Sequence, residues 1–393
     1  MDAGCRVIER DPVGAVGTGV AASAQPGPGR GRVDGLTVLR GIAIALVLLR
    51  HAAPDVFGGA GVVGVTVFFA LSGWLITGVL LADLDRCGRV YYRRFYFHRI
   101  LRLYPALLLL VVGLVLVGTL ADPLDEGPAW RWAVAVALTY TADLPLGLPV
   151  STASTHLWTL AVEEQFYLLW PFLLVLASRR ALRRGVLVAV LLCWAAAVAT
   201  VVAAGDVVVR AYFLPTSWFV ALAVGGLART LDPARLSSAL RHRTVLGATV
   251  VVLAGTCLVP DLNANRLTYL LGGPVIAVCT VVLVVAALPH QRVRSLPARA
   301  LVGLGTVSYA TYLWNWPLVT WAGALLPDQP TVLVGAGAAV ASVGVATVSW
   351  YALERPVGRA RARWGRGSTS APAACTPDLG SISAPSPSRR RRR

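Results

Sequence analysis

Charged residues are scarce in this sequence of 393 residues: they make up 14% of it, whereas hydrophobic residues make up 56%. Because a soluble domain is charged at roughly a quarter of its positions, this composition excludes an ordinary soluble protein and indicates a membrane protein. Lysine is absent, so arginine supplies all 36 basic residues. We attribute that bias to genome composition rather than to function.

Features of other protein classes are missing too. The six cysteines contain no Cys-x-x-Cys pair, and we expect neither a metal site nor a bound cofactor. No repeat of about 20 to 50 residues and no appended soluble domain are visible. A net charge of +17 would suggest nucleic-acid binding in a soluble chain, but these arginines punctuate apolar runs, as in cytoplasmic loops of membrane proteins. We therefore expect the lipid bilayer, and no nucleic acid, as a partner.

Ten apolar stretches are long enough, or nearly so, to cross a hydrocarbon core, which needs about 20 helical residues. They are 36–54, 61–82, 100–120, 158–177, 185–204, 212–229, 244–259, 268–288, 303–326 and 331–353. Lipid offers no water to the backbone, so the spans must be helices, since a barrel would show alternation instead of solid apolar runs. The sequence predicts an all-α membrane protein, a polytopic bundle of about ten transmembrane helices.

The loops between these stretches differ in charge. With ten spans and a cytoplasmic N-terminus, the arginine clusters lie in inward loops, and the outward loops are mostly acidic. This distribution follows the positive-inside rule and predicts that both termini are cytoplasmic. A further stretch, 129–141, is short, and as a full span it would invert every later loop, so we expect it to lie in or dip into the outer interface. The sequence thus predicts a multi-pass protein of the plasma (cytoplasmic) membrane.

The two ends of the chain differ from the apolar middle. Residues 1–33 contain no continuous apolar run, so we expect a disordered cytoplasmic N-terminal tail and no cleavable signal peptide. Residues 361–393 are rich in Arg, Ser and Pro and end in five arginines. Such a composition is typical of a disordered tail, again cytoplasmic. Residues 34–360 remain as one transmembrane domain.

Ionisable residues inside apolar stretches are candidates for chemistry, because burying them in a membrane is unfavourable. In the first stretch Arg40 and His51 are eleven residues apart, about three helical turns, so they share one helix face about 16 Å apart. Histidine is the side chain best suited to proton transfer near neutral pH. A lone buried histidine is more often structural, so the spacing leaves both roles open for His51.

The second stretch and the loop after it hold further candidates. Ser72 lies among small and bulky residues, a pattern that favours helix packing with the hydroxyl bonded back to its own helix. Arg99 and Arg102 are three residues apart and project from the same side of a helix that enters the membrane. This arrangement fits a two-pronged site for phosphate or pyrophosphate, and equally well a lipid anchor.

Two adjacent carboxylates, Glu163 and Glu164, lie near the outer end of the stretch 158–177. Neighbouring helical residues point about 100° apart, so at most one of the two faces the bundle squarely. A buried carboxylate seeks a cation, and we expect one of them to partner a histidine or arginine of another helix. Function and packing are equally open from this pattern alone.

Taken in order along the chain, these motifs resemble the acyltransferase-3 family of integral membrane O-acyltransferases over residues 34–360. The motifs are Arg40-x10-His51, Phe68-Phe69-x-x-Ser72-Gly73, Arg99-x-x-Arg102 before Pro105, Trp158-x-Leu-x-Val-Glu163-Glu-Gln-Phe-Tyr167, Ser308-Tyr309-x-x-Tyr312-Leu-Trp314 and Ser349-Trp350-x-x-x-Glu354-Arg-Pro356. The resemblance implies transfer of an acyl group, commonly acetyl, from cytoplasmic acyl-CoA to a hydroxyl of a sugar or polyketide-type acceptor.

The resemblance also implies catalytic roles. His51 would be the essential histidine, as a general base or as a covalent acyl carrier, and Arg40 its partner in the motif. Glu163 matches the acidic position better than Glu164 and would orient the imidazole. At Asn315 the family often has histidine, and this departure keeps the region of Asn315 out of our predicted catalytic set.

Binding roles follow from the same comparison. Arg99 and Arg102 would meet the anionic donor, with Ser72, Trp158 and Tyr167 as further substrate-binding residues. Three functions stay open at this point. The first is acylation of a cell-envelope or exported carbohydrate, the second is acylation of a macrolide or other secondary metabolite, and the third is non-enzymatic transport, which ten spans alone would allow.

Overall fold

The computed structural model describes residues 33–176, 181–231, 236 and 240–360. Within these ranges every regular element is a helix and no strand is present, which confirms the all-α class. The expected disordered tails, 1–33 and 361–393, lie outside the described residues except for Val33.

Seven helical segments of the described chain are long and apolar enough to cross a membrane. They are α1 (Asp34–Ala52), α2 (Ala60–Cys87), α3 (Tyr92–Leu120), η1 with α5 (Thr152–Leu176), α6 (Leu182–Ala204), η5 with α10 (Thr268–Ala287), and α12 with η6 and the α-helical residues after it (Thr331–Ala360). A further long helix, α11 (Leu296–Leu325, 30 residues), lies outside this set because it carries many polar and aromatic side chains.

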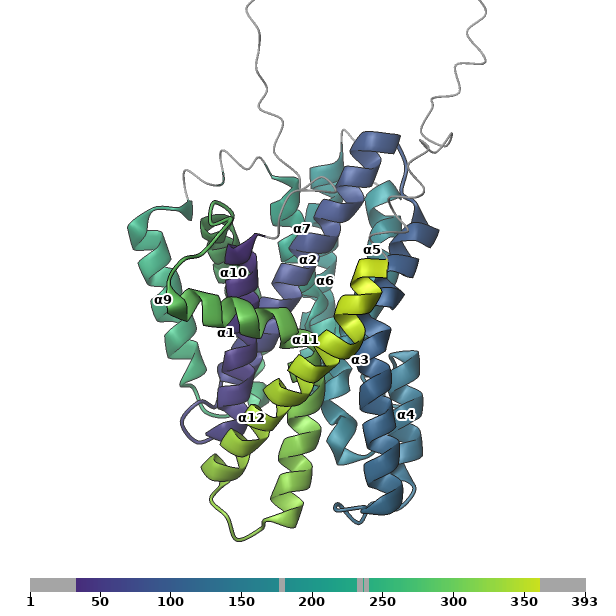
Figure 1. Cartoon of the computed structure of the whole chain (residues 1–393). Coiled ribbons are helices and arrows are strands. Elements are labelled where there is room, and N and C mark those ends of the chain that lie inside the picture. The colour runs from purple at the N-terminus through teal and green to yellow at the C-terminus, as the bar shows by residue number, and fades with distance from the viewer. Residues whose placement is uncertain (1–32, 177–180, 232–235, 237–239, 361–393) are drawn as a thin grey trace, which may run out of the picture. The chain divides into compact units, whose positions relative to one another are not determined.

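Two of the ten predicted spans, 212–229 and 244–259, form α-helices shorter than a membrane span, and the short stretch 129–141 forms a short helix, as predicted. The stretch 212–229 is divided, because Pro215 opens a 3-10 turn and only the 12 residues of α7 (Phe219–Thr230) form an α-helix. The helix α9 (Arg243–Cys257) has 15 residues, and α4 (Ala129–Thr139) has 11, too few to cross the core. In Figure 1, α4 lies beside the C-terminal part of α3, with which it packs. The count of ten spans is therefore not confirmed, whereas the prediction that 129–141 is too short for a full span agrees with the structure.

Small residues set the closest helix contacts. A Cβ atom on Gly73 of α2 would overlap the carbonyl oxygen of Leu222 in α7, and one on Gly225 of α7 would overlap that of Ala70. Gly41 of α1 and Gly305 of α11 form the same reciprocal contact between their helices. Small residues let membrane helices approach to backbone contact, so α1 is fixed against α11 as closely as α2 against α7.

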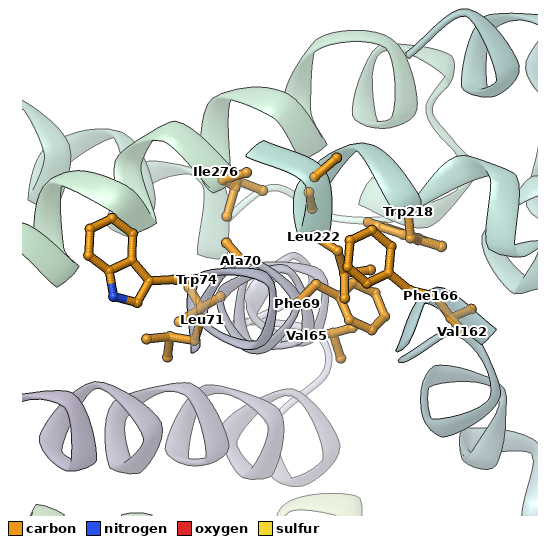
Figure 2. Close-up of a cluster of buried hydrophobic side chains, with 14 of the residues drawn as sticks. Val65, Phe69, Ala70, Leu71, Trp74, Val162, Phe166, Trp218, Leu222 and Ile276 are labelled. Carbon is orange, nitrogen blue, oxygen red and sulfur yellow. The ribbon is translucent and has the colours of Figure 1, made fainter. Parts of the chain in front are cut away.

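The helix α2 lies in the interior of the bundle. Figure 2 looks along it and shows Phe69, Leu71 and Trp74 pointing from its circumference towards neighbouring helices. All three are at most 4% exposed. An apolar helix is expected to be buried where other helices cover it, and α2 packs against α1, α5, α7, α9 and α10. Its side chains Leu75 and Val79 remain exposed.

Prolines inside two helices leave backbone carbonyls that side chains then satisfy. Proline lacks an N–H, so the carbonyl four residues earlier loses its helical partner. Pro171 in α5 frees the carbonyl of Tyr167, which accepts a hydrogen bond from the Tyr96 hydroxyl at 3.3 Å. Pro317 in α11 likewise frees the carbonyl of Leu313. Since lipid cannot satisfy these groups, a side-chain donor must.

Candidate active site

His51 lies in the last turn of α1 and is bonded across to α11. Its Nδ1 is 2.6 Å from Oδ1 of Asn315, and its ring centroid is 4.8 Å from that of Trp316. A carboxamide oxygen can only accept a hydrogen bond, so Nδ1 carries the proton. The other ring nitrogen, Nε2, is therefore the basic one, which is the arrangement that general-base or nucleophilic chemistry requires.

The partner of His51 differs from our expectation. The sequence led us to expect the carboxylate of Glu163 to orient the imidazole and to leave Asn315 out of the catalytic set. Instead the neutral carboxamide of Asn315, only 1% exposed, takes this place. The signal that could have identified it is an amide in the middle of a membrane helix, where a polar group is retained only if it has a partner.

Arg40 faces the same helix three turns away. Its Nη2 donates to Oγ of Ser308 at 3.0 Å and its Nε to the carbonyl oxygen of Gly305 at 3.5 Å. The guanidinium also lies 5.8 Å from the centre of the Phe68 ring. Arg40 and His51 therefore both bind α11, which confirms the prediction that they share one face of α1.

Glu163 is bound by two other predicted residues. The hydroxyl of Ser72 on α2 donates to its Oε1 at 2.9 Å, and the Tyr167 hydroxyl lies 3.5 Å from its Oε2. Ser72 thus bonds to a neighbouring helix rather than back to its own, because a carboxylate is a stronger acceptor than a backbone carbonyl. Glu163, Ser72 and Tyr167 form one hydrogen-bonded group between α2 and α5.

Glu164 pairs with Arg99 of α3. The guanidinium makes contacts of 2.6 to 2.8 Å to both carboxylate oxygens, and the two side chains are only 14% and 17% exposed. Arg99 also lies over the ring of Tyr167, 3.3 Å from its centre. This confirms that one of the two adjacent carboxylates partners a cation on another helix.

The two arginines of the predicted anion site have different surroundings. Arg99 turns inward to Glu164, whereas Arg102 is exposed. Arg99 and Arg102 are three residues apart on one side of the helix, as predicted, but the Arg99 guanidinium forms an ion pair with Glu164 instead of pointing the same way as Arg102. Trp158 is 3% exposed and packs against Phe69, Tyr212 and Trp218 as part of an aromatic core.

A second histidine of the site was not predicted. His156, in the 3-10 turn η1 (Thr152–Leu157), places its Nε2 3.0 Å from the Leu313 carbonyl that Pro317 leaves free. The Tyr312 hydroxyl donates to the backbone carbonyl of His156 at 3.0 Å and accepts from Thr159 at 2.7 Å. The sequence contains both partners, a histidine in one apolar segment and a proline in another. Only the fold shows that His156 lies beside the carbonyl that Pro317 leaves free.

Several buried polar atoms along α11 have no hydrogen-bond partner among the described residues. On this helix they are the hydroxyls of Tyr309 and Thr311, Nε1 of Trp314 and Nδ2 of Asn315, and Nδ1 of His156 lies against the same helix. Buried polar atoms are almost always satisfied by protein or by bound molecules. This part of α11 therefore offers donors and acceptors to a polar substrate inside an otherwise apolar bundle.

Comparisons with known proteins agree with this site. The model of the family described as "Acyltransferase domain" (Acyl_transf_3) matches residues 33–351. The chain is 26% identical to the peptidoglycan O-acetyltransferase OatA of Listeria monocytogenes and 23% identical to the O-acetyltransferase OatA of Staphylococcus aureus, over 83% of this chain in both cases. It spans only 55% and 57% of those two proteins.

A third relative is matched over most of its length. The candidate membrane-bound transacylase BcsY of Komagataeibacter xylinus is 31% identical over 82% of this chain and 81% of its own. No solved structure matches the chain. Acyltransferase relatives also argue against the transporter that ten spans alone would allow. Because the family model covers most of the sequence, the chain belongs to the acyltransferase-3 family.

Proposed function

We propose that this protein moves an acyl group, in the simplest case acetyl, from cytoplasmic acyl-CoA to a hydroxyl of a cell-envelope or exported carbohydrate. Two relatives are O-acetyltransferases, one of them named for peptidoglycan. The observation that carries the proposal is the Nδ1–Asn315 hydrogen bond of His51, which leaves Nε2 as a base inside a bundle of apolar helices. Acyl transfer to an alcohol needs such a base, because an alcohol is a poor nucleophile at neutral pH.

In this proposal His51 either takes the proton of the acceptor hydroxyl or first accepts the acyl group itself. Nδ2 of Asn315, unpartnered among the described residues, is available to the oxygen that becomes negative in the transition state. Arg40 is bonded to Ser308 of α11, and Glu163 is bonded to Ser72 of α2. These groups are assigned to shaping the site between α1, α2 and α11.

We place the donor at the cytoplasmic face, with ten spans and both termini on that side, in the plasma membrane. Arg102 is exposed and would bind the phosphates of acyl-CoA, since arginine suits planar recognition of phosphate. Arg99 would reach the donor when an anion competes with Glu164 for its guanidinium. No cofactor beyond the acyl-CoA substrate is part of the proposal.

Inverted membrane vesicles and radiolabelled acetyl-CoA test this function. The wild type is compared with His51→Ala, with Arg102→Ala and with a control, His290→Ala, which changes an exposed histidine outside the site. We expect release of free CoA and labelled glycan from the wild type and the control, and loss of both products with His51→Ala at equal protein levels. Label on an added macrolide but not on glycan would move the acceptor to secondary metabolites, and no turnover of any acyl-CoA would refute the proposal.

A further inference from the structure

His156 is held in one orientation by the fold. Its side chain is buried, 7% exposed, and Nε2 donates to the Leu313 carbonyl at 3.0 Å. Pro317 leaves that carbonyl without its helical donor. The ring lies 5.5 Å from that of Tyr312, whose hydroxyl binds the His156 backbone. The position and tilt of the imidazole are therefore fixed from both sides.

This orientation also fixes the tautomer. Because a carbonyl oxygen only accepts, the neutral ring carries its proton on Nε2 and presents a lone pair on Nδ1. That Nδ1 is buried, and although the backbone of Ala153 lies near the ring, Nδ1 makes no hydrogen bond of acceptable geometry to the described residues. Capping a free carbonyl requires only a donor, so this role does not account for the second nitrogen, and leaving a buried acceptor unsatisfied is unfavourable.

The two histidines are attached to the same short part of α11. His156 binds the carbonyl of Leu313 and His51 binds the side chain of Asn315, two residues further on. Nδ2 of Asn315 is the second polar atom at this place without a partner in the described part of the chain. One region of α11 therefore presents a base on His51, an amide donor on Asn315 and an acceptor on His156.

We propose that Nδ1 of His156 binds a second hydroxyl of the acceptor while His51 acts on the hydroxyl that becomes acylated. This inference rests on the proposed function and narrows it to acceptors with more than one hydroxyl, such as sugars. A hydroxyl on the substrate supplies the hydrogen that Nδ1 lacks. A site built in this way discriminates strongly against an analogue without that hydroxyl, because its buried acceptor is then left unpaired.

Deoxy sugars provide the test. Acetyl transfer from acetyl-CoA in inverted vesicles is measured with methyl N-acetyl-β-glucosaminide and its three monodeoxy analogues. For the wild type we expect one deoxy analogue to fail because it lacks the acylated hydroxyl, and a second to lose at least about 10-fold in kcat/KM. For His156→Phe we expect the second loss to fall to within about 2-fold, with the first unchanged.

A second variant distinguishes substrate binding by His156 from a purely structural role, by restoring the backbone donor that the Leu313 carbonyl lacks. Pro317→Ala returns a backbone N–H to the Leu313 carbonyl, so the double variant His156→Phe/Pro317→Ala needs no histidine as a cap. If this double variant regains stability but not the sensitivity to the second hydroxyl, the proposal stands. If it recovers wild-type selectivity, His156 is only a cap and the proposal fails. A wild type without any release of CoA would instead refute the proposed function, so the two failures are distinct.

Discussion

Nδ1 of His51 and Oδ1 of Asn315 lie 2.6 Å apart although 264 residues separate them in the sequence. The contact joins the end of α1 to the part of α11 just before Pro317, and the reciprocal contact of Gly41 and Gly305 fixes the two helices against each other. Reactivity of the histidine therefore depends on the packing of two helices from opposite ends of the domain.

Asn315→Ala should lower kcat by about 100-fold, the size typical of losing a correctly oriented general base. Without the carboxamide oxygen, Nδ1 has no acceptor to fix the tautomer and the ring can turn. Asn315→Asp retains an acceptor oxygen and should keep most of the activity. The measurement is acetyl-CoA turnover at matched protein levels, and an alanine variant as active as the wild type would show that Asn315 does not orient His51.

The ion pair of Arg99 and Glu164 should contribute strongly to stability. Glu164→Gln leaves a guanidinium that is 14% exposed without its counter-charge, and removing one partner of a buried pair lowers the free energy of unfolding by about 3 to 5 kcal/mol. The double variant Arg99→Leu/Glu164→Leu should recover much of this loss, since no unpaired charge remains. Thermal unfolding of the purified variants in detergent measures the loss of stability in Glu164→Gln and its recovery in the double variant.

An exposed ion pair of the same chain serves as the control for this prediction. Asp206 and Arg266 lie 3.3 Å apart with side chains that are 105% and 54% exposed. Asp206→Asn should shift the free energy of unfolding by less than about 1 kcal/mol, as expected for solvent-screened pairs. If Glu164→Gln is as mild as Asp206→Asn, burial does not strengthen the Arg99 pair.

Properties within one helix could be predicted from the sequence. The eleven-residue spacing of Arg40 and His51 fixes their common face by helix geometry alone, and the structure agrees. The divergence of Glu163 and Glu164 follows from the same rotation of about 100° per residue. Such predictions succeed because they use no information about which helices are neighbours.

Properties that depend on neighbouring helices could not be predicted. Asn315 and His156 enter the site only because α11 packs beside α1 and η1, and periodicity carries no record of that pairing. The stretch 212–229 is apolar enough to suggest a span, but Pro215 interrupts its helix. The ion pair of Arg99 with Glu164 could not be predicted for a related reason, since Glu164 belongs to another helix.

Arg102→Ala should weaken binding of the donor more than the chemical step. Loss of a charge-assisted contact to phosphate, worth about 1.5 to 3 kcal/mol, should raise KM for acetyl-CoA by about 10- to 100-fold with kcat changed only a few-fold. The matched control is Arg93→Ala, an exposed arginine of the same helix, which should leave KM unchanged. Equal effects of the two substitutions would indicate general attraction of the anion rather than a site at Arg102.

Asp143 should make the stability of the protein depend on pH. It lies outside the membrane-spanning segments, between α4 and η1, and burial raises the pKa of its carboxyl from 3.8 to about 6. Its Oδ1 accepts a hydrogen bond from Nε2 of Gln165 at 2.9 Å, and its Oδ2 has no partner among the described residues. The protonated form is thus the one that the fold favours.

A carboxyl whose pKa is higher in the folded protein than in the unfolded chain stabilises the fold when the pH is below its pKa in the unfolded chain. This stabilisation is lost as the pH rises through the pKa of the folded protein. We therefore expect the free energy of unfolding to decrease by about 1 to 2 kcal/mol between about pH 4 and pH 7, after allowance for solvent screening. The unfolding temperature should fall over the same pH range. Asp143→Asn keeps the oxygen that binds Gln165 and removes the titration, so its unfolding temperature should lack this fall and exceed that of the wild type at pH 7. The unfolding temperatures of both proteins are measured from pH 4 to pH 8. If they change with pH in the same way, the Asp143 carboxyl has the same pKa in the folded protein as in the unfolded chain, and the prediction is wrong.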